Sequence, residues 1–194
     1  MRAAVIQFPG SNCDHDLLYC LEQISGSKPV NLWHKDHDLQ GVDFVALPGG
    51  FSFGDYLRSG AIARFSPIMQ EVISFANKGG YVMGICNGFQ ILTEAGLLPG
   101  ALLHNQSRKF ICKNVNIKAV TNNSLVTSKI DTQAVLKIPI AHGEGNFYAH
   151  EDTRTPFYVN LFENILNVVL ALILVGRYGV LGLGLAFGIA YMIS

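Results

Sequence analysis

The sequence predicts an α/β protein with a mostly parallel sheet and helices on both faces, followed by an apolar helical tail. Over residues 1–152, short apolar runs that end in glycine or proline alternate with segments whose apolar residues recur at helical spacing. This alternation is typical of strands that cross over through helices to parallel neighbours. Charge then almost disappears, because Glu163 and Arg177 are the only charged residues beyond Arg154.

The first strand and helix are predicted from punctuation as much as from hydrophobicity. Residues 3–8 form an apolar run that stops at Pro9-Gly10, which indicates a buried strand. A helix is then expected to run to Ile24, with Ser11 or Asn12 as its N-cap and an apolar stripe on one side.

The later elements follow the same two patterns. Strands are predicted at residues 30–33, 44–50, 81–85, 110–120 and 134–142, and helices at 67–78 and 87–95. In parallel sheets of this kind, ligands bind at the carboxyl ends of the strands. Two segments are therefore candidate sites, LPGGFSFGD at 47–55 and GICNGFQ at 84–90.

Composition limits the function classes. Lys and Arg total 14 and so do Asp and Glu, and no basic run carries interleaved aromatics, so no nucleic-acid partner is expected. The four cysteines form no C-x-x-C pair and no metal-type cluster with the six histidines, so no metal is expected. Free thiols and an N-terminus too short in its apolar part for a signal peptide predict a cytoplasmic protein. Three of the cysteines are expected to be small core hydrophobes: Cys13, Cys20 and Cys112.

Cys86 is different because it lies between Gly84 and Gly88 at a predicted strand-to-helix turn. This is the cysteine form of the nucleophile elbow, which presents a side chain above the sheet. The N-terminus of the following helix favours the thiolate, and the backbone N–H of Asn87 points to where an oxyanion would form. A second N–H donor is expected from Gly49-Gly50. The alternative is a small buried cysteine at a glycine-rich strand end.

Four segments together resemble one family: GICNGFQIL, LPGGFSFGDYLRSGAIA, HNQSRKF and IAHGEGNFY. They are similar to the PurQ type of class I glutamine amidotransferase, the glutaminase subunit of phosphoribosylformylglycinamidine synthase. The resemblance covers residues 1–152 and implies a flavodoxin-like sheet. It also implies that Cys86 attacks the amide of glutamine, forms a thioester and releases ammonia. Its expected site comprises the backbone of Gly50 and Asn87 as oxyanion hole, and Gln90, Asn105, Gln106 and Ser107 around the substrate.

The resemblance also implies partners. Ammonia would pass to a separate synthetase subunit that makes the amidine of formylglycinamide ribonucleotide in de novo purine synthesis, and a small accessory subunit would complete the complex. ATP and Mg²⁺ would belong to the synthetase, so no cofactor is expected in this chain.

The base of the family's catalytic triad has no counterpart here. In the family it is a histidine in a P-H-P-E motif near the C-terminus, and this sequence contains no P-H-P-E. His142 lies in a family motif and is the alternative candidate base. The other histidines are expected in loops or on the surface: His15, His34, His37, His104 and His150. Without the motif histidine, the chain is expected to be inactive as it stands.

The tail resembles a different family. Residues 152–194 are similar to an internal stretch of the lipid II flippase (MurJ) family of membrane proteins. The chain is therefore interpreted as a chimera, with residues 1–152 a glutamine amidotransferase domain lacking its C-terminal part and 153–194 an apolar helical segment. Any membrane association or insolubility would come through this tail. The alternative is one buried helix of a soluble domain.

Two other functions stay open beside the enzyme. The first is a non-catalytic docking subunit of the same complex. The second is a fragment of a membrane transport protein, for which the tail is the sole argument.

Overall fold

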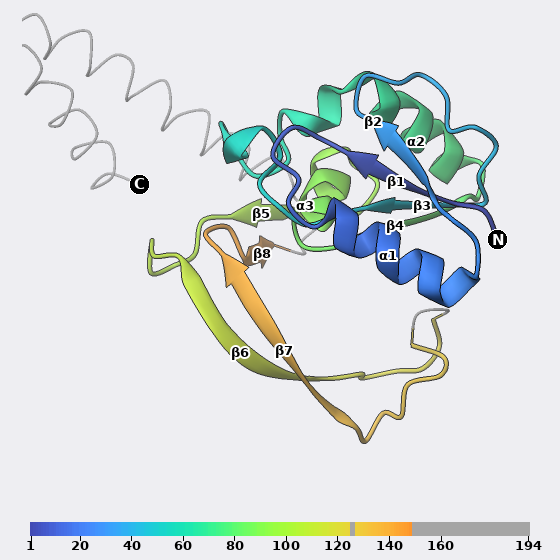
Figure 1. The fold of residues 1–194 in the computed structure, drawn as a ribbon. Coiled ribbons are helices and arrows are strands. Elements are labelled where there is room, and N and C mark those ends of the chain that lie inside the picture. The colour runs from blue at the N-terminus through green and yellow to red at the C-terminus, as the bar shows by residue number, and fades with distance from the viewer. Residues whose placement is uncertain (125–126, 149–194) are drawn as a thin grey trace, which may run out of the picture. The chain divides into compact units, whose positions relative to one another are not determined.

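The structure, a computed structural model, describes residues 1–124 and 127–148. Its main sheet has four parallel strands in the order β2-β1-β3-β4 (Figure 1). The strands are β1 (Ala3–Gln7), β2 (Val30–Trp33), β3 (Phe44–Leu47) and β4 (Tyr81–Gly84). This arrangement confirms the predicted α/β fold with a mostly parallel sheet.

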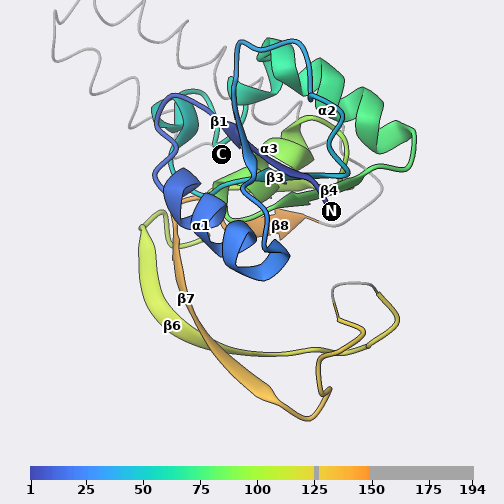
Figure 2. The same cartoon turned by 45° about the vertical axis from the view of Figure 1, so that its right-hand side comes forward.

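Three helices cover the two faces of this sheet: α1 (Asp14–Ser25), α2 (Pro67–Asn77) and α3 (Asn87–Glu94). Alternate residues of a strand point to opposite faces, and β1 shows the consequence. Ala3 and Val5 pack in a cluster with α1, whereas Ile6 packs in a second cluster with α2 and α3. Figures 1 and 2 show α1 on one side of the sheet and α2 on the other.

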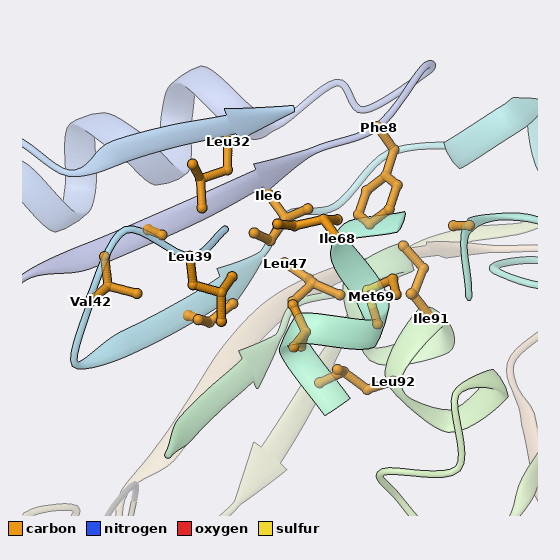
Figure 3. Close-up of a cluster of buried hydrophobic side chains, with 14 residues drawn as sticks. Ile6, Phe8, Leu32, Leu39, Val42, Leu47, Ile68, Met69, Ile91 and Leu92 are labelled. Carbon is orange, nitrogen blue, oxygen red and sulfur yellow. The ribbon is translucent and has the colours of Figure 1, made fainter. Parts of the chain in front are cut away.

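The larger core lies between the sheet and the pair α2 and α3. Figure 3 shows Ile6 and Leu47 of the sheet beside Ile68 and Met69 of α2, with Ile91 of α3 nearby. All five side chains are fully buried. Each contributes about 1.5–3 kcal/mol relative to an exposed position. This core holds α3, and with it the turn that precedes α3, against β3.

The remaining elements lie outside the main sheet. Strands β5 (Ala101–Leu103) and β8 (Asn146–Tyr148) form one pair, and β6 (Ile111–Lys118) and β7 (Val135–His142) form an antiparallel pair. Both segments predicted as late strands are confirmed. Two short 3-10 helices, η1 (Ser52–Asp55) and η2 (Ala63–Phe65), follow β3.

Residues 1–98 and 102–148 form one compact unit, and residues 99–101 belong to a second unit whose other residues lie outside the described part.

The start of α1 differs from the prediction. Its N-cap residue is Cys13 and makes no side-chain cap. Ser11 instead accepts a hydrogen bond from the Phe8 N–H at 3.1 Å, and the N–H groups of Asn12 and Cys13 both donate to the Gly49 carbonyl at 3.3 Å. The chain is therefore tied to the loop after β3 before the helix begins, which delays the helix start.

Two predictions about burial are wrong. Cys13, Cys20 and Cys112 were predicted to be core hydrophobes and are exposed. Cys86 is exposed as well. His34, predicted at the surface, is buried among Phe8, Trp33 and Phe53. It follows β2 directly, and its N–H extends the sheet by donating to Gln7.

The predicted helical tail and His150 lie outside the described residues. In the part of the chain that is described, no helix has the length and apolar character needed to cross a bilayer.

Candidate active site

Cys86 occupies the turn between β4 and α3, where it is the N-cap residue of the helix. Its φ of 52° and ψ of −110° place a non-glycine residue in the left-handed half of backbone space. Such residues cost about 1–3 kcal/mol and cluster at functional sites. The side chain is exposed. The predicted strand-to-helix elbow is therefore present, with its thiol presented to solvent at the carboxyl end of β4.

The two glycines of the elbow are required by close backbone approach. A Cβ on Gly84 would lie 2.5 Å from the carbonyl carbon of Gly88, and a Cβ on Gly88 would lie 2.1 Å from the Leu47 carbonyl oxygen. Neither position has room for a side chain. The glycine spacing thus lets α3 begin directly against β3 and β4.

The loop after β3 lies beside Cys86, as the sequence predicts. A Cβ built on Gly49 would be 3.4 Å from the Cβ of Cys86. Gly50 has φ 140°, and a Cβ there would lie 2.5 Å from the Asn12 nitrogen, so only glycine fits. The first N–H groups of a helix have no intrahelical acceptor, and Asn87 is the first residue of α3. Gly50 and Asn87 therefore bring two backbone segments to the neighbourhood of one thiol.

The side chain of Asn87 organises the loop that follows Gly50. It is 1% exposed. Its Oδ1 accepts from the Ser52 N–H at 3.0 Å, and its Nδ2 donates to Oδ1 of Asp55 at 3.2 Å and to the side-chain Oε1 of Gln90 at 3.0 Å. Sequence reasoning used only the backbone of Asn87. The structure adds a side chain that fixes the loop beside the elbow.

This loop holds several residues in unfavourable backbone conformations. Phe53, Asp55 and Leu57 all have positive φ, between 53° and 71°. Burial raises the pKa of Asp55, and the nearby charge of Glu144 acts in the same direction, whereas hydrogen bonds from Ser59 and Asn87 oppose the shift. Hydrogen bonds with the Asn87 side chain hold this loop beside the start of α3.

Gln90 connects the elbow helix to the segment after β7. Its Nε2 donates to the Glu144 carbonyl at 3.2 Å while its Oε1 accepts from Asn87. The Glu144 carboxylate is buried, accepts from the Ser59 N–H at 2.9 Å and lies 3.6 Å from Nδ1 of His104. Both ends of the Gln90 amide are thus engaged by protein groups.

Asn105 is engaged in the same way. Its Nδ2 donates to the carbonyls of Lys109 and His142 at 2.8 and 2.9 Å, and its Oδ1 accepts from the Gly145 N–H at 3.0 Å. The same Oδ1 lies 2.9 Å from Nδ1 of His142. Because Asn105 Nδ2 is committed to two carbonyls, Oδ1 is the acceptor and His142 Nδ1 carries the proton. His142 therefore offers Nε2 as its basic nitrogen.

Gln106 and Ser107, the other predicted substrate residues, are exposed beside this buried amide. The Ser107 hydroxyl accepts from the Lys109 N–H at 3.4 Å. In the described residues no group of three or more His, Cys, Asp or Glu side chains is placed to hold a metal ion.

Sequence reasoning did not single out the polar residues that support the elbow: Ser52, Asp55, Ser59 and Glu144. All four lie in the segments LPGGFSFGDYLRSGAIA and IAHGEGNFY. A polar residue inside a glycine-rich segment was the available signal. Their roles depend on contacts across 32 to 85 residues of chain, which no local pattern reveals.

The sequence profile of the CobB/CobQ-like glutamine amidotransferase domain matches residues 1–160. The chain belongs to this family. The profile of the lipid II flippase MurJ matches residues 144–194. The join predicted at Asp152-Thr153 lies within the stretch that both profiles match, and it stays a prediction.

Relatives of this chain include the phosphoribosylformylglycinamidine synthase subunit PurQ of Chlorobaculum parvum and that of Chlorobium chlorochromatii. They are 58% and 59% identical over 79% and 77% of this chain. The chain spans 61% and 64% of their lengths, less than two thirds.

A solved structure, PurLQS from Thermotoga maritima, superposes with a TM-score of 0.72 at 46% identity. The match covers 78% of this chain and 70% of that chain.

Proposed function

We propose that this chain is the glutaminase component of phosphoribosylformylglycinamidine synthase and that Cys86 is its nucleophile. The observation that carries the proposal is the exposed Cys86 thiol on a strained elbow next to Gly49-Gly50. The identity of 58% to relatives named PurQ supports it.

The chemistry follows from the elbow. The Cys86 thiolate attacks the side-chain amide carbon of glutamine, and the N–H groups of Gly50 and Asn87 stabilise the oxyanion. Ammonia leaves and a glutamyl thioester remains, which water hydrolyses to glutamate. Gln106 and Ser107 contact the substrate, whereas Gln90 and Asn105 position the groups around it through the hydrogen bonds described above.

Ammonia then passes to a synthetase subunit. The likeness of this chain to the PurLQS structure supports an assembly of this kind. In this proposal the synthetase and a small accessory subunit are the partners, ATP and Mg²⁺ belong to the synthetase, and the complex is cytoplasmic.

The proposed reaction also needs a base for proton transfer. The sequence contains no P-H-P-E, and His142 is held by Asn105 rather than by a carboxylate. Loss of one triad member typically costs about 10⁴–10⁶-fold in rate. The 194-residue chain should therefore react at Cys86 with a glutamine-like electrophile, yet release almost no ammonia from glutamine.

The test measures both quantities. Mass spectrometry follows alkylation by a glutamine chloroketone, and a coupled assay follows ammonia with and without a PurL synthetase. Replacing all residues after Asp152 with a family tail that carries P-H-P-E should restore ammonia release, and Cys86→Ala in that background should abolish it. Ammonia release by the unmodified chain near the rate of the grafted one, lost on His142→Ala, would identify His142 as the base.

The docking-subunit alternative makes a different prediction. If the chloroketone labels Cys86 no faster than the exposed Cys112, and the grafted chain releases no ammonia while still binding the synthetase, the chain is a docking subunit.

A further inference from the structure

Two cysteines from distant parts of the chain meet at Gly49. Cys13 is the N-cap residue of α1 and Cys86 that of α3. A methyl group on Gly49 would lie 3.6 Å from the sulfur of Cys13 and 3.4 Å from the Cβ of Cys86. Both side chains therefore approach the same methyl-sized volume beside Gly49, which holds no side chain because residue 49 is glycine.

The backbone holds this arrangement. The Gly49 carbonyl accepts from the N–H groups of Asn12 and Cys13 at 3.3 Å. Cys86 is fixed by the elbow, where Ile85 N–H donates to the Leu47 carbonyl at 3.0 Å. Both thiols are exposed. A disulfide needs the two Cβ atoms about 3.5–4.5 Å apart, and both side chains already lie within 3.6 Å of one point beside Gly49.

We propose that Cys13 and Cys86 form a reversible redox pair in which Cys13 resolves the oxidised form of Cys86. This inference does not rest on glutaminase activity, because it concerns the two thiols alone. Its consequence is that a mild oxidant switches Cys86 off as a nucleophile and at the same time protects it from irreversible oxidation.

The oxidant class is a peroxide. The Cys86 thiolate attacks one oxygen of hydrogen peroxide, the O–O bond breaks, and Cys86 sulfenic acid and hydroxide result. The Cys13 thiolate then attacks the Cys86 sulfur, the S–S bond forms and the S–O bond breaks with loss of a second hydroxide. Two thiols are oxidised and one peroxide is reduced to water. A dithiol reverses the reaction.

The surroundings of Cys13 control the second step. Cys13 is exposed as a residue, but partial burial of its sulfur raises the pKa of the thiol, and the charges of Asp16, Cys86 and Asp14 act in the same direction. Since the attacking species is the thiolate, disulfide formation should accelerate as the pH rises toward the raised pKa of Cys13.

The test treats the full chain with one equivalent of hydrogen peroxide, blocks the remaining thiols and maps the peptides by mass spectrometry. The expected product is an intramolecular Cys13–Cys86 link, removed by dithiothreitol. The link should persist in Cys20→Ser, which removes the other cysteine of α1. In Cys13→Ser the link should be absent, Cys86 should stop at the sulfenic acid with one equivalent, and a second equivalent of peroxide should carry it to the sulfinic acid.

Gly49→Ala supplies a second, independent variant. Its new methyl makes contacts of 3.4 to 3.7 Å, which the fold accommodates, yet it occupies the volume that both side chains approach. Link formation should slow about tenfold or more, because small misplacements of reacting groups carry penalties of this size. A link of Cys86 to Cys20 or Cys112, a link found only between two chains, or no link in the parent chain would overturn the proposal.

Discussion

Substitution of Gly88 by alanine tests the feature on which the elbow depends, the close approach of α3 to β3. The new Cβ would lie 2.1 Å from the carbonyl oxygen of Leu47, 2.6 Å from its carbonyl carbon and 2.8 Å from its Cβ. Carbon–oxygen contacts settle at about 3.3–3.6 Å. The start of α3 must therefore move away from β3 by roughly 1 Å. The contacting atoms are the backbone carbonyl and the Cβ of Leu47, which cannot turn aside as the end of a side chain can.

The magnitude follows from two opposing effects. Alanine in a helix is favoured over glycine by about 0.5–1 kcal/mol. Overpacking costs about 1–3 kcal/mol when side chains can adjust, and here a backbone carbonyl would have to adjust. We expect a net loss of about 2–3 kcal/mol of unfolding free energy. For a unit of this size that corresponds to a decrease in Tm of roughly 6–9 °C.

The assay is thermal and urea unfolding of the full chain followed by circular dichroism. Gly143→Ala is the matched control, because its φ lies outside the left-handed region and its new Cβ would only approach Phe110 at 3.8 Å. The control should change stability by less than about 1 kcal/mol. If Gly88→Ala equals or exceeds the parent chain in stability, α3 does not begin against β3 and the elbow geometry is wrong.

Three further predictions concern charged and titratable groups. Arg58 forms two hydrogen bonds, of 2.8 and 2.9 Å, to the buried carboxylate of Glu94. Arg58→Ala should therefore lower the free energy of unfolding in urea by about 1–3 kcal/mol, and a decrease below about 0.5 kcal/mol would contradict this. Burial lowers the pKa of His34, so the unfolded chain takes up a proton at a higher pH than the folded chain does. The Tm should therefore fall as the pH drops below about 6.5. An equally steep fall in Tm for His34→Gln would refute this. Burial raises the pKa of Asp55, so ionisation of this carboxyl opposes folding. Asp55→Asn keeps an acceptor for Asn87 and should raise the Tm at neutral pH, but not at about pH 3, where the carboxyl is already protonated. A lower Tm for the variant at neutral pH would count against this.

Much of the fold was accessible to sequence reasoning because its signals are local. The apolar runs of β1 and β3, stopped by proline and glycine, and the alternation in β6 and β7 report burial within a few residues of chain. The elbow at Cys86 was equally accessible, since Gly84 and Gly88 mark where a strand must turn into a helix without room for side chains. These predictions agree with the structure because sequence-local sterics decide them.

Other features depend on which segments the sheet order brings together. Cysteine is a residue type common in protein cores, yet Cys13 is an exposed neighbour of Cys86. The reason is that β1 and β4 lie on either side of β3, so the segments that follow them both reach the loop after β3. His34 is charged or neutral according to its surroundings, and only the packing of Phe8 and Phe53 around it shows that it is buried. The sequence by itself thus determined the four strands of the main sheet, the later strands β6 and β7, the three helices and the elbow at Cys86, but not the short pair β5 and β8. The tertiary structure decided which side chains surround Cys86, because contacts across tens of residues depend on strand order and loop closure rather than on any local pattern.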